Sequence, residues 1–223
     1  MKKKSIQSMT AEKILSSEDF QRCIGFHGHI CPGLAIGFQA ARVLMRWIGV
    51  ERSPDEELVA TVETDACGAD AIQVMTGCTF GKGNFIFMDH GKHAFSLSDR
   101  KQGKTVRVCL RPNALPNDPE HLSLFEKVRN EQATAEEIKL FKQLREERLQ
   151  NILDAEPESL FTIEEISTEI PPQARITESE VCKRCGEPTM SNHFQEVEGQ
   201  NVCIPCARRL FESKPPLEIP AGH

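Results

Sequence analysis

Four cysteines near the end of the chain have a spacing that is typical of a metal site. They form two CxxC pairs, Cys182 with Cys185 and Cys203 with Cys206, and 17 residues separate the pairs. Each pair presents two thiolates on one side of a tight turn, and two such pairs complete a tetrahedron around Zn²⁺. Because the protein fills all four positions, the spacing predicts a closed structural zinc site in a small finger of the treble-clef type.

A second group of candidate ligands lies near the start of the chain. His27, His29 and Cys31 alternate with Gly28 and Ile30, so an extended backbone places the three side chains on one side. Imidazole and thiolate are ligands that zinc and other late first-row metals favour. The segment predicts an open metal or redox site; the simpler alternative is a histidine that caps a helix and a cysteine that fills the core.

Cys67 begins a third group of candidate residues. It follows the short β-branched run 58–62, where we expect a strand to end and a helix to begin, and ligand crevices form at such strand ends. Asp70 and Gln73 share a helix face from which they can orient a bound ligand. Cys78 is a further candidate ligand, although any single cysteine is explained equally well as a buried apolar residue.

Together the second and third groups make up the predicted core site. We expect His27, His29 and Cys67 to bind a metal ion whose identity the sequence does not give. The predicted catalytic set is His27, His29, Cys31, Cys67 and Asp70.

A glycine-rich loop over 77–83 matches the phosphate-binding P-loop only in part. The P-loop pattern needs four residues between its glycines and a Ser or Thr after the Lys. Here three residues separate Gly77 from Gly81, and Gly83 follows Lys82. The mismatch excludes nucleotide hydrolysis of the P-loop type, and Gly81 and Lys82 remain candidates for binding an anion.

Helices and strands must position these groups. Helices are expected from about 18 to 27 and over 33–47, 69–75, 119–130 and 134–154. Strands are expected over 58–62, 84–88, 93–97, 105–110 and 160–163. Residues 89–92 are interpreted as a tight hairpin turn between two neighbouring strands. The fold class is therefore α+β, with helices outside a mixed sheet of about five strands.

Charge and apolar content limit the class of protein. The chain has 223 residues and a formal net charge of −6, which disfavours non-specific binding to nucleic acid or to anionic membranes. From residue 178 onward five basic residues stand against seven acidic ones. We therefore interpret the finger as a protein-contact or domain-docking unit. The longest apolar run, 34–50, contains Arg42 and Arg46, which is typical of a core helix and not of a membrane span.

Cysteine content and the N-terminal residues bear on the compartment. The basic start, 1–4, is not followed by a long apolar region, so it does not match a signal peptide. Nine cysteines is an odd number, which argues against a disulfide scaffold and favours metal ligands or buried thiols in a reducing environment. We expect a cytoplasmic protein.

A change of composition near residue 170 predicts two domains. The proline-rich stretch 170–173 is interpreted as a linker. The expected domains are a metal-binding α+β core over 1–170 and a Cys₄ zinc finger over 178–223, with a frayed tail around 214–216.

Three segments carry a family resemblance. Residues 26–37, 67–73 and 76–84 resemble, in this order, the FmdE family of formylmethanofuran dehydrogenase proteins, and the likeness extends over roughly 15–165. The resemblance implies a thioredoxin-like α+β core with a mixed sheet, a metal centre near the His27–Gly28–His29 segment, and homodimers. It also implies a link to molybdenum or tungsten formylmethanofuran dehydrogenase in anaerobes, and family members often carry a C-terminal zinc finger.

Three functions remain open at this stage. The first is an accessory or redox-associated subunit of a molybdenum or tungsten oxidoreductase system. The second is a stand-alone metal-dependent enzyme in which Asp70 or Glu63 acts as a base. The third is an interaction or regulatory protein whose finger docks a partner.

Overall fold

A computed structural model of the chain describes residues 9–115, 119–174 and 177–212. The chain forms two compact units, Met1–Ala174 and Arg175–His223. Each unit has a cluster of buried apolar residues of its own. The basic start, 1–4, and the proline-rich tail, 214–216, lie outside the described residues.

Among the described residues of the first unit, the five longer helices agree with the predicted ones, whereas two short helices and one 3₁₀ turn were not predicted. The helices are α1 (Ala11–Leu15), α2 (Glu18–His27), α3 (Pro32–Ile48), α4 (Gly68–Thr76), α5 (Pro119–Arg129), α6 (Ala135–Asp154) and α7 (Pro157–Leu160), with the 3₁₀ turn η1 (Phe80–Lys82). Side chains define their starts. Ser17 accepts from the Phe20 N–H at α2, and Thr134 and Glu137 form a reciprocal capping box at α6.

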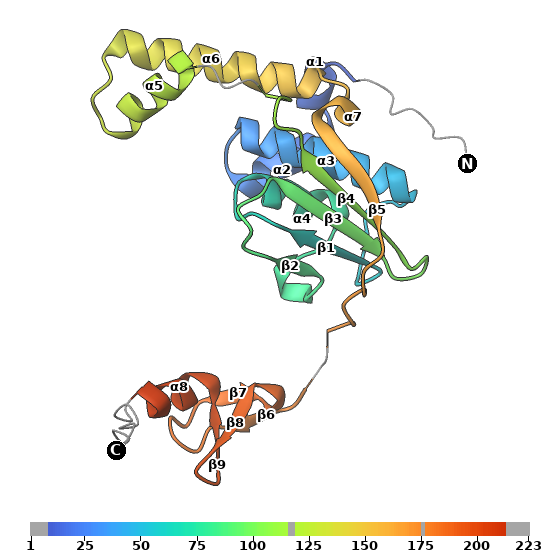
Figure 1. The fold of residues 1–223 in the computed structure, drawn as a ribbon, viewed down its shortest axis with the longest axis vertical. Helices are drawn as coiled ribbons and strands as arrows, with labels where there is room; N and C mark the ends of the chain where they lie inside the picture. The colour runs from blue at the N-terminus through green and yellow to red at the C-terminus, as the bar shows by residue number, and fades with distance from the viewer. Residues whose placement is uncertain (1–8, 116–118, 175–176, 213–223) are drawn as a thin grey trace, which may run out of the picture. The chain divides into compact units, whose positions relative to one another are not determined.

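A five-stranded mixed sheet forms the centre of the first unit (Figure 1). Its strands are β1 (Leu58–Val62), β2 (Phe85–Phe87), β3 (Ala94–Asp99), β4 (Lys104–Leu110) and β5 (Phe161–Ile166), in the order β2-β1-β3-β4-β5. β1 and β2 are parallel, whereas the other neighbours are antiparallel. The predicted α+β class with a mixed sheet is confirmed.

The predicted hairpin turn at 89–92 is wrong, because β2 and β3 are not neighbours. They lie on opposite sides of β1, so that Val62 is in register with Phe87 on one side and Phe95 on the other. The Met88 N–H donates to the Val62 carbonyl, and the segment that follows passes around the end of β1. Four of the five residues of β1 are buried, and a central place gives this strand hydrogen-bond partners at both edges.

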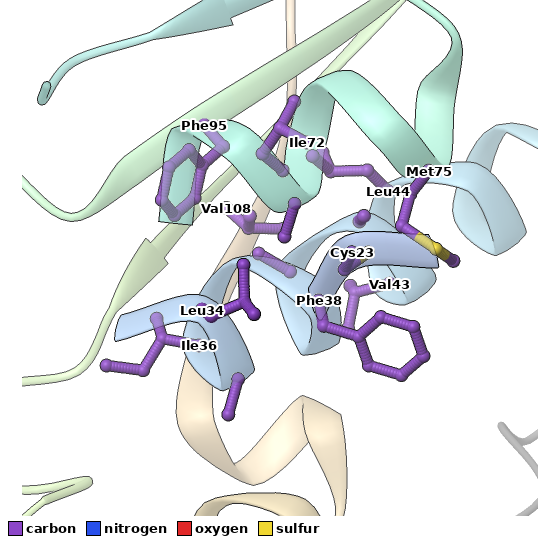
Figure 2. Packing of buried hydrophobic residues seen from close by; sticks show 14 of the residues in the cluster. Cys23, Leu34, Ile36, Phe38, Val43, Leu44, Ile72, Met75, Phe95 and Val108 are labelled. Carbon is purple, nitrogen blue, oxygen red and sulfur yellow. The ribbon is translucent and has the colours of Figure 1, made fainter. Parts of the chain in front are cut away.

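Helix α3 is largely buried and lies in the centre of the core. Leu34 and Leu44 of α3 pack with Ile72 and Met75 of α4 and with Phe95 of β3 (Figure 2). The predicted core helix is thus confirmed, and no helix among the described residues has the length and apolar character needed to cross a membrane.

Two glycines allow α3 and α4 to approach closely. A Cβ atom at Gly37 of α3 would lie 2.2 Å from the carbonyl oxygen of Gly68, the first residue of α4. Since real Cβ contacts are never so short, any other residue at Gly37 would push the helices apart. The start of α4 is therefore held against the first turns of α3.

The second unit consists of two small hairpins and one helix. Its elements are β6 (Ser179–Val181), β7 (Pro188–Met190), η2 (Ser191–His193), β8 (Phe194–Val197), β9 (Gln200–Cys203) and α8 (Ile204–Glu212). Val197, Val202 and Ala207 are buried together with three of the four cysteines. The arrangement fits a small zinc-finger domain, as predicted.

Candidate metal centre

Three elements of the core unit meet at the candidate site. His27 is the last residue of α2, and Gly28 ends that helix with a φ of +91°, a conformation that favours glycine. Cys31 is the N-cap of α3, where its sulfur accepts the Leu34 N–H at 3.3 Å. Cys67 is the N-cap of α4. The close glycine contact between α3 and α4 therefore also brings the two thiols together.

The donor atoms of His27, Cys31 and Cys67 all lie within 4.8 Å of one another. The Cys31 sulfur is 3.8 Å from His27 Nε2. Ligands that lie about 2.0–2.3 Å from a tetrahedral zinc are roughly 3.5–4 Å apart, so this spacing fits one ion with small adjustments. Two sulfur donors and one imidazole also suit zinc and neighbouring metals by softness. Three protein donors leave a tetrahedral site with one open position.

Asp70 orients the imidazole of this group. Its Oδ2 lies 2.7 Å from His27 Nδ1. When Nδ1 carries the proton, the Nδ1–H group donates a hydrogen bond to this carboxylate. Nε2 then has a free lone pair that faces the Cys31 sulfur. A carboxylate behind a histidine ligand fixes the tautomer and raises the basicity of the ligand. Asp70 thus acts through His27 and does not join the three clustered donors.

Burial and mutual repulsion affect the thiols. The pKa of Cys67 is raised, first by burial and then by the hydrogen bond and the charge of the neighbouring Cys31. Both sulfurs lie at helix N-termini, where the helix dipole and free N–H groups favour negative charge. A bound cation would remove the repulsion between two thiolates, because each thiolate would then face a positive charge.

His29 lies beside the cluster but outside it. It is exposed, and its ring centroid is 4.4 Å from that of His27. The structure thus places His27, Cys31 and Cys67 of the predicted core site together, and His29 of the predicted ligand set lies beside them. The predicted roles of His29 as a metal ligand and a catalytic residue stay predictions.

Cys78 lies away from the cluster. It follows the C-terminal end of α4, and the nine residues of this helix span about 13 Å at ~1.5 Å per residue. Its thiol is fully buried, and burial raises its pKa. Cys78 is therefore placed as a core residue.

Glu63 is also placed away from the site. It continues β1 directly after Val62, so its side chain lies on the face of the sheet opposite to Val62, Phe95 and the helices. Its carboxylate contacts Arg107 Nε at 2.6 Å and His90 Nδ1 at 3.1 Å. The hydrogen bond from Arg107 holds the pKa of Glu63 below its usual range. Glu63 is thus placed as a structural ion-pair partner and not as a base for the metal site.

The anion-binding residues proposed in the glycine-rich loop lie elsewhere. Gly81 and Lys82 belong to η1. Lys82 Nζ donates to the carbonyl oxygens of Pro54 at 3.4 Å and Asp55 at 3.0 Å. These bonds hold the loop closed. Binding of an anion by Gly81 and Lys82 stays a prediction.

The four finger cysteines form the second cluster. Their sulfurs also lie within 4.8 Å of one another. Backbone N–H groups of Cys185 and Cys203 lower the pKa of Cys182 to about 6. These N–H groups favour the thiolate, which is the form that binds metal, whereas burial and the neighbouring Cys203 thiol raise the pKa of Cys206. Four sulfur donors with this spacing suit a metal such as zinc and leave no open position.

Two features of the core site are not evident from ligand motifs. One is the group of small residues at the crossing of α3 and α4, where Gly33, Gly37 and Gly68 let the backbones touch. In the sequence, the spacing of four residues between Gly33 and Gly37 was the one signal that these glycines share a helix face. The other is a group of arginines on α5 and α6 that lines a cavity beside Gly33. No spacing rule connects these helices to the His27 segment, because their distance in sequence is about one hundred residues.

Comparison with known proteins gives consistent matches. A probable S-adenosyl-L-methionine-binding protein of Archaeoglobus fulgidus is 34% identical over an alignment of 193 residues, which covers 83% of this chain and 51% of that protein. The chain thus spans about half the length of this curated relative. The crystal structure of a tungsten formylmethanofuran dehydrogenase FmdE-like protein from Syntrophus aciditrophicus matches with a TM-score of 0.56 and 26% identity, over 89% of this chain and 97% of the other.

The family match covers the core site. The model of the family described as FmdE, molybdenum formylmethanofuran dehydrogenase operon, matches residues 26–162. This range includes His27, Cys31, Cys67 and Asp70 and takes up more than half of the chain. The chain therefore belongs to the FmdE family.

Proposed function

We propose that this chain is a metal-binding accessory protein of the FmdE type, which serves a molybdenum or tungsten oxidoreductase system of the formylmethanofuran dehydrogenase kind. In this proposal His27, Cys31 and Cys67 hold one metal ion in the core unit. The finger holds a structural zinc ion and contacts a partner protein. We further propose that the protein is a cytoplasmic homodimer.

One observation carries the proposal. Donor atoms from three separate elements lie within 4.8 Å of one another, and a carboxylate orients the only imidazole among them. Buried cysteines that merely fill a core need neither a facing histidine nor a carboxylate behind it. The combination of two thiols, an oriented imidazole and two helix N-termini favours a cation site over a packing arrangement.

The chain's own residues have separate roles in this site. Cys31 and Cys67 bind the ion through sulfur, and His27 binds it through Nε2. Asp70 keeps the His27 proton on Nδ1. His29 lies exposed beside the His27 ring. A metal ion bound here would supply Lewis-acid or redox chemistry at a position that a substrate can reach.

Metal analysis of the purified full-length protein tests the core site. We expect two metal ions per chain in the wild type, and one fewer in Cys67→Ser and in Cys31→Ser, with the finger ion retained. Cobalt substitution adds a spectroscopic readout, because thiolate ligands give Co²⁺ charge-transfer absorption. The proposed core site has two thiolate ligands and the finger has four. Loss of the core ion should therefore lower the charge-transfer absorption by about one third.

Cys109→Ser is the matched control. This thiol is half-buried on β4 and lies in neither cluster, so its replacement should leave both metal ions in place. Equal metal content in the wild type, Cys31→Ser and Cys67→Ser would contradict a core metal site.

The partner role needs a separate experiment. Affinity capture from the native cell with the full chain should recover subunits of a molybdenum or tungsten dehydrogenase, and capture should fail with Cys182→Ser if the finger contacts the partner. Light scattering of the purified protein should give twice the 25.0 kDa mass of one chain. Recovery of no dehydrogenase component would contradict the accessory role, while the metal site would stand on its own data.

A further inference from the structure

A cavity of about 820 Å³ lies between the α5–α6 hairpin and the first turn of α3. Pro32 and Gly33 line it from α3, and they directly follow the proposed ligand Cys31. A Cβ atom at Gly33 would lie 3.1 Å from the Cys67 Cβ and 3.8 Å from the Cys31 sulfur. Gly33 therefore contacts the proposed metal ligands and also lines the cavity, so that the two adjoin at this residue.

The opposite wall of this cavity is basic. Arg129 at the end of α5 and Arg145 and Arg148 on α6 line it, and none of the described lining residues is acidic. Neither Arg129 nor Arg145 forms an ion pair with another described residue. Guanidinium groups repel one another when they share a hollow, and planar oxyanions are the ligands that they bind in pairs. In a chain with net charge −6, this local concentration points to an anionic ligand.

Aromatic and aliphatic side chains form the rest of the lining. The His121 ring stacks on Phe141 with centroids 5.2 Å apart, and the Arg129 guanidinium lies 5.9 Å from the Phe125 ring centroid. Leu122 and Phe125 are 50% and 45% exposed although they are large and apolar. A ring or a hydrocarbon portion of a ligand would cover these surfaces and gain from removing them from water.

The basic wall is fixed to the core before any ligand arrives. Gln39, fully buried in α3, donates through Nε2 to the carbonyls of Ile152 at 3.0 Å and Leu153 at 3.1 Å in the last turn of α6. An ion pair between Lys127 and Glu137 joins α5 to α6. A site whose walls are already positioned loses less entropy on binding.

We propose that this cavity binds an organic anion that carries at least two oxyanion groups, carboxylate or phosphate, together with a ring or another apolar part. The three arginines bind the oxyanions, and the phenylalanine rings contact the apolar part. This ligand class extends the proposed function and rests on it, because the bound molecule adjoins, at Gly33, the ion held by Cys31 and Cys67.

Calorimetric titration of the full-length, metal-loaded protein tests the proposal. Trimellitate, with three carboxylates, and 1,4-phenylene bisphosphate, with two phosphates, are the ring-bearing probes, and tricarballylate carries three carboxylates without a ring. We expect trimellitate to bind about tenfold more tightly than tricarballylate, because only the former covers the phenylalanine wall. The tighter of the two ring-bearing probes identifies the oxyanion that the arginines prefer.

The double variant Arg129→Gln and Arg145→Gln should weaken trimellitate binding by at least about tenfold, since two charge-assisted contacts are removed. The matched control is Arg208→Gln and Arg209→Gln, two exposed residues of the finger helix, which changes the net charge equally and should leave affinity within about twofold. If the double variant does not fold, trimellitate affinity is measured for the single variant Arg129→Gln, whose position is exposed.

Equal trimellitate affinity in the wild type and in the Arg129→Gln, Arg145→Gln variant would overturn the proposal. Failure of both ring-bearing probes to bind the wild type would also overturn it. Metal content measured on the same samples separates this result from failure of the proposed function. Metal bound to Cys31 and Cys67 without anion binding contradicts the cavity alone. Arginine-dependent anion binding in a protein without core metal contradicts the metal site alone.

Discussion

The two cysteine-rich clusters of this chain differ in how their donor atoms are brought together. In the finger, each CxxC pair lies within one turn, and two short hairpins place the pairs face to face. In the core, His27 and Cys31 are separated from Cys67 by about forty residues, and they meet only because α3 and α4 touch at Gly37 and Gly68. The finger cluster is local, whereas the core cluster depends on tertiary packing.

The clusters also differ in what they leave open. Four sulfurs would fill all positions of a tetrahedral ion in the finger, whereas three donors in the core would leave one of the four positions open. A closed site contributes folding energy, and an open one can bind a further molecule. A large cavity lies beside the open cluster. Under the proposed function, this difference predicts that a metal in the finger stabilises the fold and that a metal in the core takes part in chemistry, and the following changes test that division.

The largest effect is expected for Cys182→Ser. Structural zinc contributes on the order of 10 kcal/mol to the folding of small finger units. The variant should lose one metal ion per chain, and hydrogen exchange should show loss of protection over 177–212 with unchanged protection over 9–174. Retained protection in the finger would show that its small core folds without the ion, which contradicts a structural role.

A smaller but still large effect is expected for Gly37→Ala. The added methyl group would overlap the Gly68 carbonyl, so we expect a loss of about 3 kcal/mol in the free energy of unfolding, measured by urea denaturation. Core metal affinity should fall as well, because Cys67 moves away from Cys31. Gly25→Ala is the control: nothing lies within 4 Å of a Cβ there, and alanine in α2 should be neutral or stabilise by up to about 1 kcal/mol.

Asp70→Asn removes the carboxylate that lies behind His27 and leaves the three clustered donors unchanged. Loss of such a carboxylate weakens metal binding by about 10- to 100-fold, which corresponds to roughly 1.4–2.7 kcal/mol. Competition titration with a chelator should show this change for the core ion, while the finger ion keeps its affinity. An unaltered core affinity would mean that His27 is not a ligand or does not need its carboxylate partner.

The smallest effect is expected for Glu63→Gln, on the face of the sheet away from the core cluster. Replacing the charged bond to Arg107 should cost about 1–2 kcal/mol in the free energy of unfolding at neutral pH. Because the pKa of Glu63 is lowered in the folded state, its stabilisation is present above the ordinary carboxyl pKa of about 4.3 and is lost as the pH falls through the lower, folded-state pKa. The difference between wild type and variant should therefore shrink in acid. Core metal content should not change; a loss would place Glu63 in the metal site.

Local sequence signals predicted most elements of the core unit. Capping residues such as Ser17 and Thr134 and the apolar spacing of α3 define the helices well, because the relevant interactions lie within one or two turns. The pairing of the strands was harder to predict. Residues 89–92 have turn-forming composition, yet β1 lies between the flanking strands, since strand order depends on which strand must be buried at the centre.

The sequence by itself determined the donor types, the CxxC spacing and the family likeness, because each of these is carried by residues close together along the chain. Tertiary structure decided that Cys31 and not His29 lies with His27 and Cys67, that Glu63 lies on the opposite face, and that arginines of α5 and α6 surround a cavity beside the site. The physical reason is that helix approach at a glycine contact and the alternation of a sheet depend on distant backbone segments, which no local spacing encodes.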